Sequence, residues 1–166
     1  VVIPALSLGG AQRSLIKLVN ALQPTCDRIT LVTLGDAEPA MVRELNPGAA
    51  TVRSLYGGST LNPLLWLRLW VLLRREGADV VVGWSTYANL VLCLLRPLLS
   101  MNRLVLSERN YIPRIFGRGQ GGRAWRHGLA LLAMRWLYPR AHVITANSTK
   151  NVRFLQKYIG GSGRYV

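Results

Sequence analysis

The feature that most constrains the fold of this 166-residue chain is a regular alternation of short apolar runs with longer amphipathic segments. Apolar runs rich in β-branched residues predict strands, and apolar residues three or four positions apart predict helices. The predicted strands are the first run, which ends at Pro4, and residues 29–34, 50–55, 80–82, 104–106 and 143–145. The predicted helices are residues 11–22, 38–45, 61–75, 87–99, 123–137 and 149–158. This order is typical of an α/β fold in which helices cover both faces of a parallel sheet.

Two adjacent glycines, Gly9 and Gly10, stand where the first strand gives way to the first helix. Glycines let a ligand approach the backbone closely, and the free N–H groups and dipole of a helix's first turn favour a phosphate. The pattern is neither the G-x-G-x-x-G fingerprint of dinucleotide-binding folds nor a Walker loop. A tight turn without a ligand is the alternative interpretation.

Polar residues follow several of the predicted strands. Ligands of parallel sheets bind beyond the carboxyl ends of the strands. Chain order therefore predicts one rim, formed by residues 7–13, 84–89, 107–110 and 147–148. The glycine-rich residues 113–122 predict a mobile loop on the same side, suited to closing over an acceptor.

The formal net charge of +14 is unevenly distributed. Residues 1–95 hold eight Lys and Arg against six Asp and Glu, whereas residues 96–166 hold thirteen against one. Such a basic surface attracts anionic lipid head groups, pyrophosphate-linked acceptors or nucleic acid. Basic and aromatic residues alternate over residues 112–137, which indicates a segment that docks on a membrane. A helix packed on the sheet with solvated arginines is the alternative, and no nucleic-acid-binding motif supports the third option.

Several kinds of site are not expected from the sequence. Cys26 and Cys93 lie far apart, which indicates free thiols in a reducing compartment. His127 and His142 are isolated, so we expect no metal site. The apolar residues 77–95 divide into a short strand and a helix, neither long enough to cross a bilayer. The start of the chain has no basic leader typical of a signal peptide.

Four stretches of the chain carry a family resemblance. They are residues 4–13, residues 78–84 with Ala78 where proline is usual, residues 104–110 ending in Ser-Glu-Arg-Asn, and residues 141–148. In order and spacing they resemble the first half of glycosyltransferases of the family-4 type, which have the GT-B fold of two Rossmann-like domains facing each other across a cleft. The resemblance implies that residues 1–166 form a single acceptor-side domain.

The resemblance implies a retaining, metal-independent enzyme. It would transfer a sugar from a nucleotide-sugar donor to a lipid-linked or cell-surface glycan precursor at the cytoplasmic face of a membrane, with no cofactor beyond that co-substrate and no nucleic-acid partner. The family's donor-binding half, with its pair of glutamates, has no counterpart in these residues. Because donor and acceptor are held between both domains, we expect this piece to be inactive alone.

The resemblance and the rim together define candidate site residues. Gly9, Gly10 and Arg13 would bind the donor's phosphates. Glu108 is the candidate catalytic residue, which would orient the acceptor hydroxyl or accept its proton, although many relatives have a histidine near this strand end. The other candidates would bind the acceptor, with a phosphate at Arg109 and a sugar hydroxyl at Asn110: Ser107, Arg109, Asn110, Asn89, Asn147 and Ser148.

Alternative interpretations remain at this stage. Glu108 is the sole acid in residues 96–166, and an ion-paired structural role is its alternative. The alternative to phosphate binding for Arg13 is that its side chain simply faces solvent. For the whole chain, the alternatives are a non-enzymatic module of Rossmann-like fold that binds phosphate or nucleic acid, and a sugar-nucleotide epimerase of the same two-domain fold.

Overall fold

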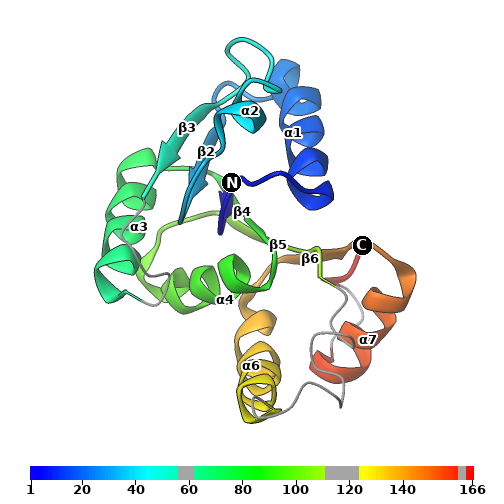
Figure 1. Ribbon diagram of the computed structural model, residues 1–166. Helices are drawn as coiled ribbons and strands as arrows, with labels where there is room; N and C mark the ends of the chain where they lie inside the picture. Colours follow the sequence, from blue (N-terminus) through cyan, green and yellow to red (C-terminus); the bar gives the residue numbers. More distant parts are fainter. Residues whose placement is uncertain (56–61, 111–123, 161–163) are drawn as a thin grey trace. The chain divides into compact units, whose positions relative to one another are not determined.

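The computed structural model describes residues 1–55, 62–110, 124–160 and 164–166 of the chain (Figure 1). The predicted loop at residues 113–122 and the first part of the predicted membrane segment, residues 112–123, lie outside the described residues. The chain divides into two compact units, Val1–Glu76 and Gly77–Val166. Each unit is described by itself.

The first unit contains three parallel strands. Strand β2 (Thr30–Thr33) lies between β1 (Val2–Ile3) and β3 (Thr51–Ser54), with Val2 opposite Val32. The described helices of this unit are α1 (Gly10–Leu22), the 3-10 turn η1 (Gln23–Thr25), α2 (Pro39–Val42) and α3 (Pro63–Glu76). Helices α1 and α3 lie on opposite sides of β2 and β3 in Figure 1, as expected for an α/β fold.

Local chemistry explains where α3 begins and ends. Pro63 occupies its first position, where a missing N–H is harmless, and the Leu64 N–H donates to Asn62 Oδ1 at 3.0 Å. Gly77 follows the last helical residue with φ of 57°, a left-handed conformation that glycine adopts without a steric penalty. The asparagine, proline and glycine therefore bracket the helix much as the sequence predicts.

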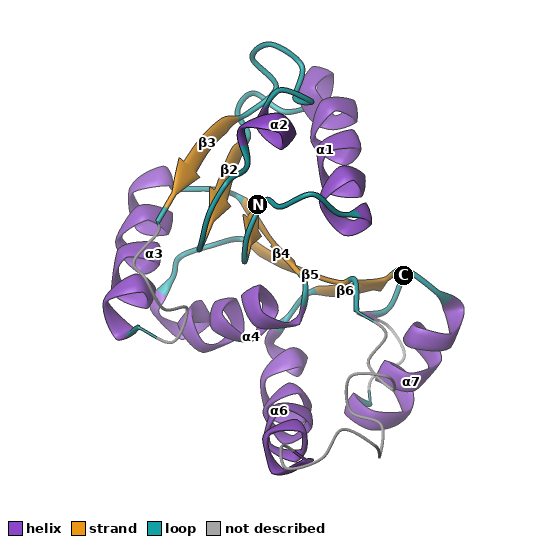
Figure 2. Cartoon of the chain, viewed as in Figure 1, coloured by secondary structure: helices purple, strands orange, loops and turns teal. Residues whose placement is uncertain are grey.

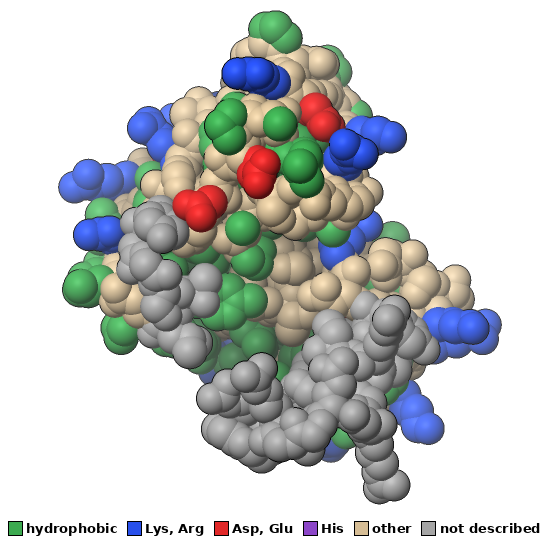
Figure 3. Space-filling model, viewed as in Figure 1, with side chains coloured by type: hydrophobic (Ala, Val, Ile, Leu, Met, Phe, Trp, Pro, Cys, Tyr) green, Lys and Arg blue, Asp and Glu red, His purple; other side chains and the backbone are tan. Residues whose placement is uncertain are grey.

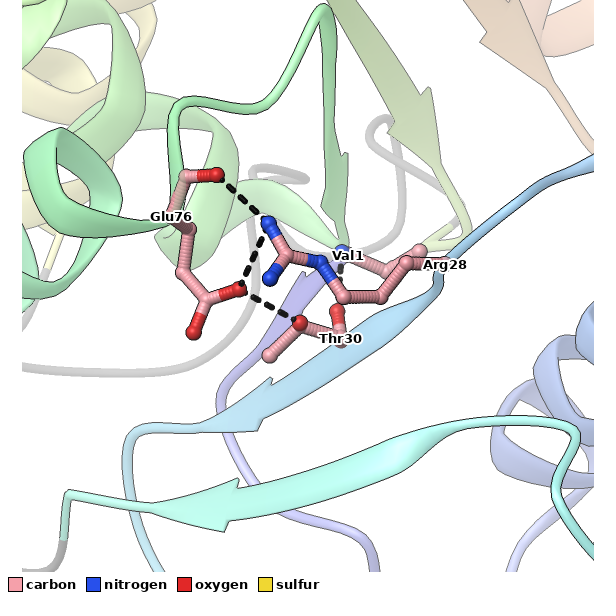
Figure 4. A network of polar contacts seen from close by, with 4 residues as sticks. All are labelled: Val1, Arg28, Thr30 and Glu76. Carbon is pink, nitrogen blue, oxygen red and sulfur yellow. Dashed lines mark hydrogen bonds and ion pairs between the residues drawn. The ribbon is translucent and has the colours of Figure 1, made fainter.

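Polar contacts hold the end of α3 against β2 (Figure 4). Thr30 Oγ1 donates to Glu76 Oε2 at 2.9 Å, and Arg28 Nη2 donates to the Glu76 carbonyl oxygen at 2.8 Å. Arg28 Nη2 also lies 3.6 Å from Glu76 Oε2. The Val1 nitrogen donates to the Thr30 carbonyl oxygen at 2.7 Å. The carboxylate of Glu76 thus points to the strands of its own unit.

The second unit also contains three parallel strands. Strand β5 (Arg103–Glu108) lies between β4 (Val80–Trp84) and β6 (Val143–Ala146). Helix α4 (Thr86–Leu95) packs on β4 and β5, α6 (Ala124–Leu137) contacts α4 and α7 (Thr149–Ile159), and α7 contacts β6. Two short 3-10 helices, η2 (Arg96–Leu98) and η3 (Tyr138–Arg140), complete the described elements. Leucine and isoleucine side chains from β5, β6 and the helices form the core.

The predicted strands and helices are confirmed in type and order (Figure 2). Strands β4 and β5 extend two residues further than predicted, to Trp84 and to Glu108. Two helices are shorter. Helix α2 covers Pro39–Val42 and is followed by turns, and α4 ends at Leu95 before η2. Pro97 explains the second difference, because proline cannot donate the N–H that would continue an α-helix.

Within the described part of the chain, none of the helices combines the length and the hydropathy needed to cross a membrane. Residues 77–95 divide into β4 and α4, as predicted.

Candidate functional site

The candidate site of the second unit lies where its three strands end. Trp84 pairs with Ser107, and Glu108 pairs with Ala146, so the residues that follow β4, β5 and β6 emerge at one edge. Hydrogen bonds then connect the candidate residues of this edge with one another. The structure brings together Asn89, Ser107, Glu108, Arg109, Asn110, Asn147 and Ser148.

Glu108 is the centre of a buried polar network. Its side chain has no exposed surface. Oε1 accepts hydrogen bonds from Thr86 Oγ1 at 2.7 Å and from the Asn110 backbone N–H at 3.1 Å, and Oε2 accepts from the Tyr138 hydroxyl at 2.8 Å. All three donors are neutral. Among the described residues the ion pairs involve Glu44 and Glu76, so the structure contradicts the ion-paired interpretation of Glu108.

Burial controls the ionisation of this network. Loss of solvent raises the pKa of Glu108, and the hydrogen bonds from Thr86, Tyr138 and Asn110 offset part of that rise. Burial, with the charge of Glu108, raises the pKa of Tyr138 well above its ordinary value. Since its carboxylate oxygens are already engaged inside the protein, Glu108 positions Thr86 and the backbone of Asn110. Its predicted role as the base that accepts the acceptor's proton stays a prediction.

Asparagine side chains connect the segments that follow β5 and β6. Asn110 Nδ2 donates to Thr86 Oγ1 at 3.1 Å, and Asn147 Nδ2 donates to the Arg109 carbonyl oxygen at 3.0 Å. The buried Asn151 of α7 donates through Nδ2 to the Asn110 carbonyl oxygen at 2.6 Å and to Asn147 Oδ1 at 3.1 Å. These bonds hold the carbonyl groups of Arg109 and Asn110, which limits the freedom of Arg109 before any ligand arrives.

The other candidates at this edge have supporting contacts. Asn89 Nδ2, fully buried in α4, is 3.3 Å from the Ser107 carbonyl oxygen and 3.4 Å from the Tyr138 hydroxyl. Ser107 Oγ accepts from Thr145 Oγ1 at 3.1 Å. Ser148 is the N-cap of α7, where its Oγ accepts from the Asn151 backbone N–H at 3.3 Å. Asn89 and Ser107 are buried, whereas Asn147 and Ser148 are exposed at the edge.

Arg109 carries the positive charge of the edge. Its guanidinium carbon lies 3.9 Å from the centroid of the Trp84 ring, a cation–π contact. Its Nε is buried and has no hydrogen-bond partner among the described residues, and burial lowers the pKa of the guanidinium. The neighbouring carboxylate of Glu108 is turned into the interior. A planar cation held on an aromatic face is well placed to bind an anion.

The residue between β4 and α4 has an unusual backbone. Ser85 has φ of 86° and ψ of 160°, and it is the one non-glycine residue with positive φ in the part of the chain that the structure describes. Its N–H donates to the Ser107 carbonyl oxygen at 2.9 Å, and its own carbonyl oxygen accepts from the Asn89 N–H at 3.0 Å. Such a conformation is strained for a residue with a side chain and is concentrated at functional sites.

The predicted donor-phosphate residues lie in the first unit, at the start of α1. Gly9 has an extended φ of −173°, and a Cβ there would lie 2.6 Å from Gln12 Oε1. A Cβ at Gly10 would meet no atom within 4 Å, so this position leaves the start of the helix open. Arg13 Nε lies 3.5 Å from Glu44 Oε1 in an exposed ion pair. Glu44 therefore shares the charge of Arg13.

Two partners in the network lie outside the rim and the candidate residues predicted from the sequence: Tyr138 and Asn151. Asn151 had a local signal, because it lies four residues before the buried Leu155 on the inner face of α7. A polar residue on an apolar helix face is a sign of a buried hydrogen bond. Tyr138, which follows α6, had no such signal.

The cysteines agree with the free-thiol prediction. Cys26 is exposed, Cys93 is buried, and neither forms a disulfide. Burial raises the pKa of the Cys93 thiol to about 12. The described residues contain no group of three His, Cys, Asp or Glu side chains that could hold a metal ion.

The fold and the polar edge define an α/β, Rossmann-like domain with a candidate site at the carboxyl ends of its strands. The model of the family "Glycosyltransferase Family 4" matches residues 8–165, and the chain belongs to this family. The predicted resemblance to a family-4-type domain of GT-B fold is thereby confirmed.

Solved structures confirm the predicted fold class, a Rossmann-like parallel sheet with helices on both faces. Anabaena HepE in complex with UDP is 17% identical, with a TM-score of 0.70 over 99% of this chain and 42% of that chain. The complex of HepE with UDP-glucose gives a TM-score of 0.67 at 17% identity, over the same shares of the two chains. The chain thus spans less than half the length of these structures. No curated protein sequence matches it.

Proposed function

We propose that this glycosyltransferase domain is the acceptor-side part of a retaining enzyme. The enzyme would transfer a hexose from a nucleotide-sugar donor to a lipid-linked or cell-surface glycan precursor. The observation that carries the proposal is the edge of β4, β5 and β6, where Arg109 is held on Trp84 beside the buried Glu108 network. The complexes of HepE with UDP and UDP-glucose support the choice of donor.

In this proposal Arg109 binds a phosphate of the acceptor, and Asn110 and Asn147 beside it bind sugar hydroxyls. Glu108 holds Asn110 and Thr86 in place, and it is the candidate group for accepting the acceptor's proton. Asn89, Ser107 and Ser148 act by supporting this edge. Positioning of this kind lowers the barrier because the reacting groups need no further ordering.

The donor's phosphates would lie at the start of α1. Gly10 leaves the first turn accessible, and Arg13 adds positive charge that Glu44 partly offsets. No metal and no cofactor beyond the nucleotide sugar take part in the proposed reaction. The second, donor-binding domain would complete the site, so residues 1–166 alone would not catalyse transfer.

A membrane surface is the proposed location of the acceptor, at the cytoplasmic side. Helix α6 supports it with three apolar side chains at helical spacing: Leu129 is 55% exposed, Leu132 53% and Trp136 73%. Arg135 stands next to them. An exposed apolar face with arginine beside it is suited to the head-group layer of an anionic bilayer.

The coding sequence beyond Val166 tests the enzymatic proposal first. We expect it to encode a second α/β half with the family's pair of glutamates. The protein that carries both halves should then transfer sugar from UDP-glucose or a related donor to a lipid-linked acceptor. Conversion of the donor's sugar without any acceptor would instead favour an epimerase, and a chain that ends here would contradict an enzyme acting by itself.

Replacement of Arg109 tests the acceptor site. We expect Arg109→Gln to raise the KM for a phosphate-bearing acceptor by about tenfold or more, since an ionic contact to a bound anion contributes on the order of 1.5–3 kcal/mol. The KM for the donor should change little. Arg109→Lys should restore part of the effect, because lysine keeps the charge but loses the planar contact with Trp84.

Arg103→Gln is the matched control, because Arg103 is an exposed arginine at the other end of the same strand. It should leave both KM values unchanged. An unaltered acceptor KM in Arg109→Gln, with the fold intact by circular dichroism, would remove Arg109 from the proposed site.

A further inference from the structure

Helix α3 of the first unit exposes an apolar and basic face. Six residues of this helix fall on one side at helical spacing, and we call them the outer face of α3: Leu64, Leu67, Arg68, Val71, Arg74 and Arg75. Leu64 is 59% exposed and Leu67 52%. The buried Leu65 and Leu69 lie on the opposite side. Two leucines that are more than half exposed on adjacent turns call for an explanation beyond core packing.

The charges of this outer face all have one sign. Arg68, Arg74 and Arg75 are exposed, and the guanidinium carbon of Arg74 lies 5.3 Å from the centroid of the Trp70 ring. Glu76, the acid of this helix, is directed away from them toward Thr30 and Arg28 (Figure 4). No described carboxylate forms an ion pair with these three arginines. The outer face is therefore cationic as well as apolar.

The space-filling view agrees with this composition. At the left edge of Figure 3, where Figure 1 shows α3, blue Lys and Arg side chains lie next to green hydrophobic ones. Neither kind forms a separate block there. At the surface of a bilayer, the leucines could insert among the acyl chains while the arginines bind the lipid phosphates.

We infer that the outer face of α3 is a docking surface for an anionic membrane. A bilayer with anionic lipids offers phosphate to the arginines and an apolar layer to Leu64 and Leu67. A second copy of the chain related by a two-fold axis would bring arginine against arginine, which costs energy. Nucleic acid would leave the leucines in water. The partner shares its chemistry with the surface proposed for α6, but the contact is made by a different element of a different unit.

A fluorescent label on the outer face tests this inference. In a Cys26→Ser background, which removes the exposed thiol, Leu67→Cys would carry an environment-sensitive dye and Lys17→Cys on α1 would be its control. The protein is mixed with vesicles of phosphatidylcholine containing phosphatidylglycerol. We expect a blue shift at position 67, with quenching by brominated lipid, and no change at position 17. A dye that stays in water while the protein is bound overturns the inference.

A second variant addresses the charge and leaves the leucines intact. Changing Arg68, Arg74 and Arg75 together to Gln should weaken vesicle binding by at least about tenfold, because each basic residue near an anionic surface contributes about 1 kcal/mol. The matched control, Lys17→Gln together with Arg43→Gln and Arg53→Gln, removes three exposed basic residues of the same unit outside α3 and should change binding less. Equal effects of the two variants would contradict a specific role of α3.

The outcomes separate this inference from the proposed function. If the protein binds vesicles while the dye at position 67 stays in water, α3 is eliminated as a docking element and α6 remains as the contact. Absence of vesicle binding would contradict both membrane contacts. Glycosyl transfer to a water-soluble acceptor, measured on the protein that carries both halves, depends on neither.

Discussion

At the scale of single residues, the main feature of the second unit is the buried carboxylate of Glu108, which accepts hydrogen bonds from neutral donors. Glu108 loses its hydration, and the hydroxyls of Thr86 and Tyr138 together with one backbone N–H replace it. Each neutral hydrogen bond contributes about 1 kcal/mol, which is less than the cost of removing a charge from water. The pKa of Glu108 is raised for that reason.

The raised pKa predicts how stability depends on pH. The folded protein holds the proton of Glu108 more tightly than the unfolded chain, so the contribution of this group to stability is largest below the unfolded value near 4.5 and is lost as pH rises through the folded pKa. Glu108→Gln removes this dependence. We therefore expect the stability of the variant, relative to the wild type, to improve across the range of pH above that unfolded value. Urea denaturation across that range measures it.

Two controls make the prediction specific to the burial of Glu108. Glu38→Gln changes an exposed glutamate and should give a difference from the wild type that does not vary in this way. Glu108→Ala leaves the donors of Thr86 and Tyr138 without an acceptor and should be less stable than Glu108→Gln by on the order of 3 kcal/mol at every pH. If the stabilities of Glu108→Gln and the wild type followed parallel pH profiles, this would contradict a buried carboxyl with a raised pKa.

The sequence identifies Glu108 but not its environment. Its isolation among arginines made it conspicuous, and the spacing of Ser-Glu-Arg-Asn after an apolar run placed it at a strand end. Its hydrogen bond to Tyr138 joins residues thirty positions apart. No local pattern encodes such a contact, because it depends on how η3 meets β5. The sequence-based alternative of an ion pair was wrong for the same reason.

At the scale of elements, the turn from β4 into α4 holds the one non-glycine residue with positive φ in the described part of the chain. Ser85 adopts φ of 86°, where glycine pays no steric penalty. We predict that Ser85→Gly stabilises the protein by about 1 kcal/mol, because relief of strain of about 1–3 kcal/mol exceeds the added entropy of the unfolded chain. Guanidinium denaturation measures the change.

Ser85→Ala is the matched control for this position. Alanine keeps a Cβ and therefore the strain, so its stability should stay within about 0.5 kcal/mol of the wild type. If Ser85→Ala stabilised the protein as much as Ser85→Gly, the hydroxyl and not the backbone would be the source of the effect.

Element types were predictable because most strands are short apolar runs and helices such as α1 and α7 have a clear period. The ends of β4 and β5 were less predictable, since Trp84, Ser107 and Glu108 are extended for reasons of pairing and not of composition. The exposure of the outer face of α3 could not be predicted from the sequence for a different reason. Exposed leucines such as Leu64 and Leu67 have the same spacing as buried ones, so a sequence pattern cannot tell a docking face from a core face.

The distribution of charge governs the behaviour of the whole molecule. With a net charge of +14, the chain should bind anionic vesicles at low ionic strength and release them as salt is added. We expect at least about a tenfold loss of affinity between low salt and a salt concentration at which the Debye length is about 3 Å. Vesicle co-sedimentation across a salt series measures it.

Neutral vesicles are the control for the electrostatic part. They should retain a weak, salt-independent binding, because Leu129, Leu132 and Trp136 of α6 still contribute apolar contacts. Binding to phosphatidylcholine alone that equals binding to anionic vesicles would contradict a charge-driven association.

The network around Glu108 also restricts the routes by which this domain can diverge. Thr86, Asn110 and Tyr138 come from three separate segments, and each gives a hydrogen bond to the same carboxylate. Loss of the hydroxyl at position 86 or 138, or of the carboxylate at position 108, leaves a buried partner unsatisfied, so neutral drift at any one of these three sites is blocked. Lineages that replace the glutamate must therefore pass through paired changes, and positions 86, 108 and 138 should be inherited as one correlated set.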